Sequence, residues 1–282
     1  MPPGRLKSAL ANREVPATRA GGAVAMIAVA ALATSIGLVL SSGGGTAGAS
    51  GRPSPAPPAR PAVAPARQAA HLRPADRLPA VHDSIELATV RATAPRYAAP
   101  GRLADGTVPA SWYQRPSVLP VIATRPGWVR VRLAQRPDGT TAWLPASDVT
   151  LSSTPYRIVV DLATTRLALY DHGRLVFSAP AGVGAEDDPT PTGEFFVAFD
   201  EPPPEADPGY GPFIIVTSDH SQAISDWEGS GDAVIGIHGP LGEDGLIGTT
   251  GARISHGCVR LHLQSLERLA QVPPGTPIDV IG

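Results

Sequence analysis

Near its C-terminus the chain carries the segment Ile254-Ser255-His256-Gly257-Cys258-Val259-Arg260-Leu261, which holds the only cysteine among 282 residues. A second segment, Ile235-Gly236-Ile237-His238-Gly239, precedes it by about twenty residues. In an exported protein, which the N-terminus of this chain indicates, a single cysteine cannot form an intrachain disulfide. The lone thiol beside glycine and histidine therefore points to chemistry.

Nucleophilic catalysis is the chemistry that these residue types favour. A thiolate attacks rather than a thiol, and a neighbouring base makes the thiolate available near neutral pH. His238 follows the apolar run 233–237, which is typical of a buried strand able to hold an imidazole rigidly. His256 lies two residues before Cys258, but Gly257 permits a turn between them. We therefore expect His238 to be the base and Cys258 a deprotonated nucleophile.

Gly257 has a use of its own, because a residue without a β-carbon lets backbone N–H groups approach a substrate carbonyl closely. The N–H groups of Gly257 and Cys258 are candidate oxyanion donors. The alternative is that Cys258 is a small buried apolar residue near two hydrogen-bonded histidines. The clustering of five such positions favours the catalytic interpretation.

Zinc binding is a third possibility, because imidazole and thiolate are common zinc ligands. It would use His238, His256 and Cys258, but the sequence lacks a paired C-x-x-C spacing and an evident fourth ligand. We therefore predict no metal. Stoichiometric zinc that is lost on Cys258→Ser would contradict the nucleophile assignment.

These residues carry a family resemblance. His238, a gap, then Ser255-His256-Gly257-Cys258, a small apolar residue and Arg260 resemble the signature of the L,D-transpeptidase catalytic domain of the YkuD type. The stretch Thr190-Pro191-Thr192-Gly193-Glu194-Phe195 is similar to a second segment common in that family. The resemblance covers roughly residues 156–282 and implies a mainly β fold, a β-sandwich with one short helix after the catalytic cysteine.

The resemblance also implies a role for each matching position. Cys258 would be the nucleophile, His238 the base, and the carbonyl of Gly239 would orient the imidazole. The oxyanion hole would be lined by His256, Gly257 and Cys258. The candidates for substrate binding are Arg260, Ser255 and Tyr210, although Tyr210 precedes His238 by a longer interval than the family's flap tyrosine and His220 lies nearer.

The activity that follows from the resemblance is peptidoglycan cross-linking. Cys258 would attack a stem-peptide carbonyl at the bond that follows diaminopimelate, release D-alanine, and pass the acyl group to an amine of a second stem. With water as acceptor the same site would be an L,D-carboxypeptidase, and an inactive site would leave a wall-binding structural protein. The expected partners are stem peptides. No cofactor is expected, because the sequence has no P-loop or dinucleotide fingerprint.

Charge divides the chain in two. Residues 1–154 hold 17 basic and 7 acidic residues, whereas residues 155–282 hold 6 and 18, although the whole chain has a net charge of only −2. The acidic C-terminal part argues against a nucleic-acid partner, whose phosphates it would repel.

The N-terminal part predicts export. A basic cytoplasmic segment, residues 1–19, precedes residues 20–40, an uncharged run long enough to span a bilayer as an anchor or to act as a signal peptide. Residues 41–83 are rich in Pro and Ala and are expected to be a disordered linker. We expect a membrane-anchored or secreted protein outside the cytoplasm, with a membrane contact through this segment.

Two β domains are expected after the linker. Residues 84–152 contain short strand-like runs, and their Gly127-Trp128 and Ala142-Trp143 pairs resemble a bacterial SH3-like β-barrel. Residues 155–282 hold the catalytic domain, whose strands are predicted at 157–162, 166–170, 175–178, 194–199, 213–216, 234–238 and 278–281. A short amphipathic helix is predicted at 263–272, with Pro273-Pro274-Gly275 ending it.

Overall fold

The structure is a computed structural model that describes residues 84–205, 207–226, 231–249 and 251–282. The basic segment 1–19, the apolar segment 20–40 and the linker 41–83 that the sequence predicts lie outside these residues. Within the described ranges, none of the helices combines the length and apolar character needed to cross a membrane.

The N-terminal domain is built on a five-stranded antiparallel sheet with the strand order β8-β7-β6-β1-β9. In β7, Val129 and Val131 are buried while Arg130 is exposed, as strand alternation predicts. The resemblance to an SH3-like barrel stays a prediction. The strands and the short helix η2 of this domain are β1 (Ile85–Val90), β2 (Ala94–Arg96), β3 (Gly106–Val108), β4 (Ser111–Trp112), β5 (Arg115–Pro116), β6 (Val118–Arg125), β7 (Trp128–Arg132), β8 (Thr141–Pro145), η2 (Ala146–Asp148) and β9 (Val149–Thr154).

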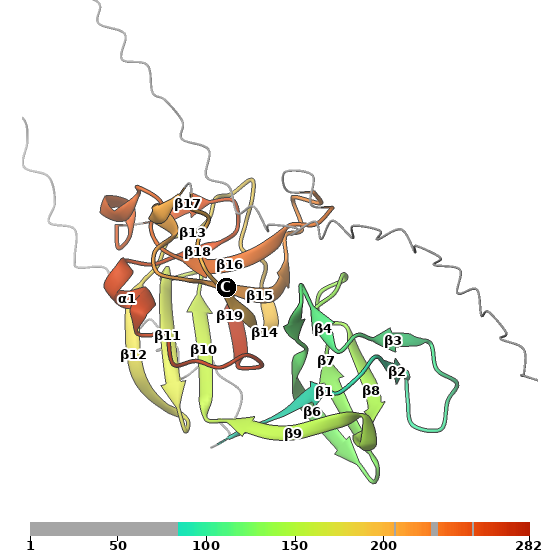
Figure 1. The fold of residues 1–282 in the computed structure, drawn as a ribbon. Helices are drawn as coiled ribbons and strands as arrows, with labels where there is room; N and C mark the ends of the chain where they lie inside the picture. Colours follow the sequence, from blue (N-terminus) through green and yellow to red (C-terminus); the bar gives the residue numbers. More distant parts are fainter. Residues whose placement is uncertain (1–83, 206, 227–230, 250) are drawn as a thin grey trace, which may run out of the picture.

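The C-terminal domain is built on an eight-stranded mixed sheet with the order β12-β11-β10-β19-β14-β15-β16-β18, as Figure 1 shows. Its elements are β10 (Tyr156–Asp161), β11 (Arg166–Asp171), β12 (Arg174–Pro180), β13 (Val183–Gly184), β14 (Gly193–Glu201), η3 (Pro208–Tyr210), β15 (Ile214–His220), β16 (Val234–His238), η4 (Asp244–Leu246), β17 (Arg253–Ser255), β18 (Val259–Arg260), α1 (Leu263–Glu267) and β19 (Pro277–Ile281). Every strand predicted in this domain is present, with ends shifted by a few residues.

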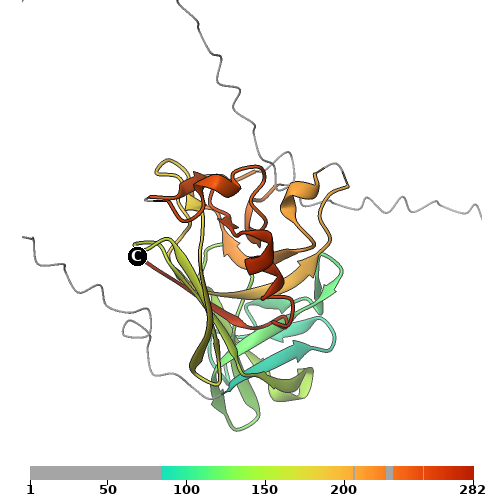
Figure 2. The ribbon, with the colours of Figure 1, turned by 90° about the vertical axis from the view of Figure 1, so that its left-hand side faces the viewer.

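The sheet curls on itself, so that both of its halves enclose one apolar core (Figure 2). Ile158 and Leu167 come from one half, and Ile215 and Ile237 come from the other. The domain is therefore the mainly β sandwich that the sequence predicts. Burial of these aliphatic side chains is the main force that holds the two halves together.

Helix α1 is shorter than predicted, because it ends at Glu267 rather than at Val272. The N–H groups of Leu269 and Val272 bond to the carbonyls of Leu266 and Leu269, three residues back, so the chain continues in tighter turns. These turns still bury all three side chains in the core. Leu263, the first residue of the predicted amphipathic helix, is 44% exposed.

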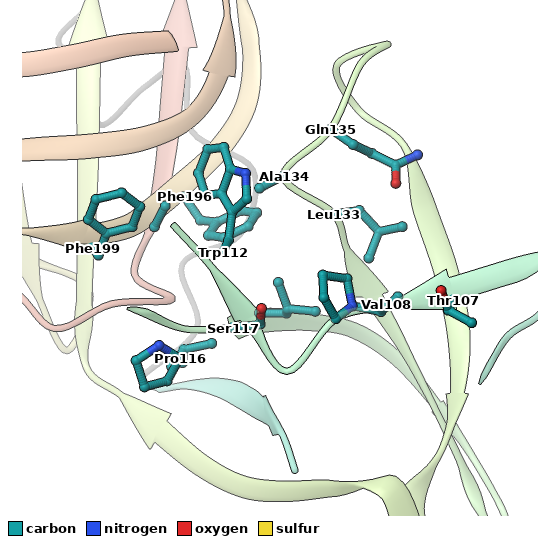
Figure 3. A pocket seen from close by; sticks show the side chains of 14 residues that line it. Thr107, Val108, Trp112, Pro116, Ser117, Leu133, Ala134, Gln135, Phe196 and Phe199 are labelled. Carbon is teal, nitrogen blue, oxygen red and sulfur yellow. The ribbon is translucent and has the colours of Figure 1, made fainter. Parts of the chain in front are cut away.

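The two domains meet at a mixed apolar and polar interface. Phe196 of β14 belongs to the core of the N-terminal domain. An apolar cavity of about 60 Å³ lies beside it, and side chains from both domains line it (Figure 3). Across it, the rings of Trp112 on β4 and Phe199 on β14 lie 5.8 Å apart, edge to face. Arg132 pairs with Glu194 at the same interface. The N-terminal domain thus packs on β14 of the C-terminal domain.

Candidate active site

Strands β16 and β18 bring the two predicted catalytic segments together. They run parallel, with Ile237 opposite Val259 and His238 opposite Arg260. Ile237 and Val259 both point into the core. Side chains alternate along a strand, so His238 and Arg260 lie on the opposite face, and Cys258, the residue before Val259, is directed to that face as well.

Cys258 is half-buried, and its sulfur accepts a hydrogen bond from the backbone N–H of Gly236 at 3.3 Å. The sulfur therefore lies where the ladder between β16 and β18 would otherwise continue. Gly236 also adjoins the imidazole, because a β-carbon built at this glycine would lie 3.7 Å from Cδ2 of His238, the ring carbon next to Nε2. It would also lie 3.3 Å from Ile214. Gly236 thus adjoins both the thiol, through its N–H, and the imidazole.

His238 is fully enclosed, with 1% of its surface exposed. Its Nδ1 lies 2.8 Å from the carbonyl oxygen of Gly239. Because a carbonyl can only accept, Nδ1 carries the proton and Nε2 of the neutral ring is left as an acceptor. Nε2 has no hydrogen-bond partner within the described part of the chain. A buried acceptor without a hydrogen-bond partner costs free energy. A general base needs such a free lone pair to take up the proton of its substrate or nucleophile.

Burial sets the protonation of both groups. It lowers the pKa of His238 to about 3, and the nearby charge of Arg260 lowers it too, against the opposing effect of the Gly239 carbonyl. Burial likewise raises the pKa of the Cys258 thiol, although the Gly236 N–H and the charge of Arg260 oppose this; Asp219 adds to the rise. The resting pair is therefore a neutral thiol and a neutral imidazole. Desolvation of the sulfur thus opposes the resting thiolate that the sequence predicts.

Gly239 is tightly enclosed by the short helix η3. Its N–H donates to the carbonyl of Tyr210 at 2.8 Å, and a β-carbon at this position would lie 2.7 to 2.9 Å from backbone atoms of Gly209 and Tyr210. The ring of Tyr210 packs on the ring of His238, with centroids 4.7 Å apart. Tyr210 is 1% exposed, so in this conformation it supports the imidazole and does not face solvent.

The turn that presents Cys258 is held by side-chain hydrogen bonds. Ser255 is buried, donates from Oγ to the carbonyl of Cys258 at 2.5 Å and accepts from the N–H of Gly257 at 3.2 Å. Thr190 donates to the carbonyl of Gly257 at 2.6 Å. Gly257 has φ +115°, and a β-carbon there would lie 2.7 Å from Ile235. Only glycine fits this backbone conformation without strain. Ser255, a predicted substrate contact, thus has its hydroxyl bonded within the turn.

His256 and Arg260, the other predicted site residues, each contact an acidic side chain. His256 is directed outward, and its Nε2 lies 3.8 Å from the carboxylate of Asp188. Within the ranges that the structure describes, no three His, Cys, Asp or Glu side chains are grouped closely enough to hold a metal ion. Arg260 is buried and pairs through Nη1 with Glu243. It shares the face of Cys258 and His238, so its charge acts on both groups.

Three residues at the site carry no role in the sequence interpretation. Gly236 lies within the quoted Ile235–Gly239 segment, but a glycine in an apolar run gives no sign that its N–H will meet a sulfur. Thr190 lies in the second family-like stretch, which could have pointed to it. Asp219 is 2% exposed and has one carboxylate oxygen without a hydrogen-bond partner among the described residues. Nothing in its sequence neighbourhood indicates this burial.

The fold and this arrangement define a class: a curled β domain that presents one thiol and one neutral imidazole from adjacent parallel strands. Comparison with known proteins agrees. Residues 155–280 match the family model of the L,D-transpeptidase catalytic domain, YkuD. The match covers 126 of the 282 residues.

Individual proteins resemble this chain over part of its length. The chain is 34% identical to YkuD of Bacillus licheniformis and 30% identical to YkuD of Bacillus subtilis, each over 127 residues that make up 45% of this chain and 66% of the relative. The chain thus spans just under two thirds of the length of these curated relatives. Among solved structures, it is similar to an L,D-transpeptidase from Mycobacterium smegmatis, with 21% identity over 57% of this chain and 81% of that one and a TM-score of 0.37. The catalytic domain of the E. faecium L,D-transpeptidase gives 23% identity over 45% and 96%, with a TM-score of 0.33.

Proposed function

We propose that the protein is a peptidoglycan L,D-transpeptidase that joins stem peptides through an acyl-enzyme on Cys258. The observation that carries the proposal is the site itself. The sulfur of Cys258 and the imidazole of His238 both adjoin Gly236, and Nε2 of His238 is an unoccupied proton acceptor. The match of residues 155–280 to the family of catalytic domains supports the same conclusion.

The protonation of the site suggests how acylation proceeds. As the sulfur of Cys258 attacks the diaminopimelate carbonyl that is bonded to D-alanine, its proton passes to Nε2 of His238, so thiolate and imidazolium form together during the reaction. The imidazolium then gives this proton to the departing amine of D-alanine, and a thioester remains on Cys258. In the second half, Nε2 accepts a proton from the attacking stem amine. The thiol regains a proton when the new amide bond forms.

The developing oxyanion needs donors near the sulfur, and such a donor contributes roughly 3 kcal/mol in acyl-transfer sites. Of the two predicted backbone donors, the N–H of Gly257 already donates to Ser255, which leaves the N–H of Cys258 as the stronger candidate. Arg260 would contribute through its positive charge, because Glu243 already engages its guanidinium.

The proposal is tested with purified protein and defined tetrapeptide muropeptides, read by mass spectrometry. The expected product is a cross-linked dimer, and Cys258→Ala should abolish both this product and the covalent adduct with imipenem. Release of D-alanine without dimer would instead identify an L,D-carboxypeptidase. A protein that forms neither adduct nor product, while its Cys258→Ala variant retains full cellular function, would be a wall-binding structural protein.

The proposed location is outside the cytoplasmic membrane, with attachment through residues 20–40. The basic segment before this uncharged run supports that orientation. The N-terminal β domain would act as a wall-binding module, in keeping with its SH3-like sequence pattern. Two measurements test these points: membrane fractionation of the full chain against a chain lacking residues 1–40, and sedimentation of residues 84–154 with purified peptidoglycan.

A further inference from the structure

A polar cavity of about 310 Å³ lies outside the site described above. It is bounded by the turn between β10 and β11, by Pro180 at the end of β12, and by Gly248, Thr249, Gly251 and Arg253. Several lining residues are exposed, among them Ala163 and Thr249, so the cavity is open to solvent. Figure 1 shows β17 and β13 next to β18, in the part of the molecule that also holds β16.

Two arginines line this cavity. Arg166 donates from Nε and Nη2 to the hydroxyl of Ser178, and Arg253 donates from Nη2 to the carbonyl of Leu162. Neither guanidinium pairs with a carboxylate among residues that the structure describes. By contrast, the half-buried Arg157 and the buried Arg260 of the same domain pair with Asp279 and Glu243. Two arginines that form no salt bridge with a described carboxylate favour anion binding at this opening.

The composition of the domain makes this placement more informative. Residues 155–282 contain only 6 basic residues against 18 acidic ones. Two of those 6 basic residues therefore line the same cavity, in a domain whose net negative charge disfavours anion binding elsewhere.

Hydroxyl groups complete the polar lining. The hydroxyl oxygen of Thr164 is buried and has no hydrogen-bond partner within the described residues. It belongs to the turn whose backbone is fixed by Asp161, which accepts from the N–H groups of Ala163 and Thr164. A hydroxyl can donate to a bound anion, and a buried one without a partner gains most from doing so.

The cavity lies within reach of the thiol. Arg253 starts β17, which ends at Ser255 and continues through the hydrogen-bonded turn to Cys258. Cys258 follows Arg253 by five positions, so their Cα atoms are at most roughly 17 Å apart even in a fully extended chain. A stem of three to four residues spans about 10 to 14 Å when extended. An extended stem therefore covers most of this largest possible distance between Cys258 and Arg253.

We propose that this cavity binds a free carboxylate of the stem peptide whose carbonyl is attacked by Cys258, through Arg166, Arg253 and the hydroxyl of Thr164. This inference rests on the proposed function and adds a specificity site to it. It predicts that the enzyme prefers stems with their carboxylates free over stems that carry an amide in place of one of them.

The test uses three synthetic tetrapeptide stems: one with both internal carboxylates free, one amidated at the glutamate, and one amidated at the side chain of diaminopimelate. The variant is Arg166→Gln combined with Arg253→Gln, because glutamine keeps a donor but removes the charge. Arg174→Gln is the matched control, since Arg174 is exposed at the start of β12 and does not line the cavity. The rate of Cys258 acylation by imipenem, which carries no stem, is measured for every protein.

The double variant should raise KM for the free stem at least tenfold, with kcat unchanged and imipenem acylation as fast as in the wild type. For one of the two amidated stems, KM in the wild type should be as high as KM for the free stem in the variant. The variant should give the same KM for that amidated stem and for the free stem. This amidated stem also serves as an internal control for folding, since its KM should be the same in both proteins.

Equal KM values for all three stems in the wild type, with normal imipenem acylation, would overturn the carboxylate site while leaving the proposed function intact. If the wild type neither turns over any of the stems nor is acylated by imipenem, the proposed function itself is overturned. Competitive inhibition by inorganic phosphate without any dependence on amidation would assign the cavity to a phosphate group and contradict a stem-carboxylate site.

Discussion

The thiol of Cys258 lies in surroundings that favour its neutral form. Two groups favour the thiolate, the N–H of Gly236 and the charge of Arg260, but burial outweighs them and the pKa is raised above 9.0. A cysteine activated in advance by an imidazolium would instead have a low pKa. The difference decides whether the nucleophile exists before substrate arrives or forms as the substrate reacts.

This difference gives a direct prediction for alkylation by iodoacetamide. The rate at Cys258 should rise about tenfold for each pH unit up to pH 9, because the reactive thiolate fraction does so below the pKa. Mass spectrometry reports this rate cleanly, since the chain has no other cysteine. His238→Gln is the control and should leave the rate at pH 6 to 7 unchanged. A rate plateau in that pH range that His238→Gln removes would reveal a preformed thiolate–imidazolium pair.

His238 makes a second prediction, about stability. The pKa of His238 is about 3 in the folded protein and 6.5 ordinarily, so between these pH values the unfolded chain binds a proton at this imidazole and the folded protein does not. The free energy of unfolding is therefore lost as pH falls from about 6.5 toward 3, at about 1.4 kcal/mol per pH unit. Urea denaturation should show the wild type losing about 3 kcal/mol more than His238→Gln between pH 7 and pH 4.

Other groups titrate in this range, which is why the comparison with the variant is needed. Asp200 has its pKa raised to about 6 by burial, so it contributes stability below its ordinary pKa of 3.8 that is lost as pH rises through 6. Its effect has the opposite sign to that of His238 and is present in both proteins, so it cancels in the difference. Parallel pH profiles for the wild type and His238→Gln would show that the imidazole is not held neutral by the fold.

At the scale of elements, the short helix η3 is held against the end of β16. The N–H of Gly239 bonds to the carbonyl of Tyr210, the N–H of Leu241 bonds to the carbonyl of Gly209, and Gly211 lies against Leu263 and Leu266. The helix η3 therefore fixes the ring of Tyr210 against His238, and the same glycine that receives η3 also supplies the carbonyl that orients the imidazole.

Gly239→Ala should disturb this arrangement. Its new β-carbon would meet backbone atoms of η3 at less than 3.0 Å, and a backbone cannot move aside as the end of a side chain can. We expect a loss of about 1–3 kcal/mol in the free energy of unfolding, as for other overpacked sites, together with slower acylation by imipenem. Gly245→Ala is the control, because nothing lies within 4 Å of a β-carbon there. Equal stability and acylation in the two variants would mean that η3 does not constrain the imidazole.

The elements also show what the sequence can and cannot predict. Strands such as Tyr156–Asp161 and Val234–His238 were predictable, because apolar runs and alternation are local signals. The end of α1 was not, because the turns after Glu267 satisfy the same burial with tighter hydrogen bonding. The pairing of Cys258 with His238 was predictable through the family resemblance. Their protonation was not, since it depends on the burial that the whole fold creates.

At the scale of the whole molecule, a polar cluster joins the two domains. Arg136 of the N-terminal domain donates to Asp232 at 2.9 Å and to the carbonyls of Ser221 and Ile224 at 2.7 and 3.1 Å. His220, which is 2% exposed, contacts Asp138 through Nδ1 and Asp232 through Nε2, each at 3.2 Å. These contacts gather at the end of β15 and the start of β16, the strand that carries His238.

The last prediction follows from this cluster, because Arg136 donates to three acceptors of the other domain through one planar group. Arg136→Gln cannot reach all three, so it should lower the free energy of unfolding by about 1–3 kcal/mol and split a single calorimetric transition into two, one for each domain. Arg130→Gln is the matched control, because among the described residues Arg130 bonds only to Thr141 inside its own domain. If both variants unfold alike in one transition, the domains are joined by their apolar contacts around Phe196, and the polar cluster adds no coupling.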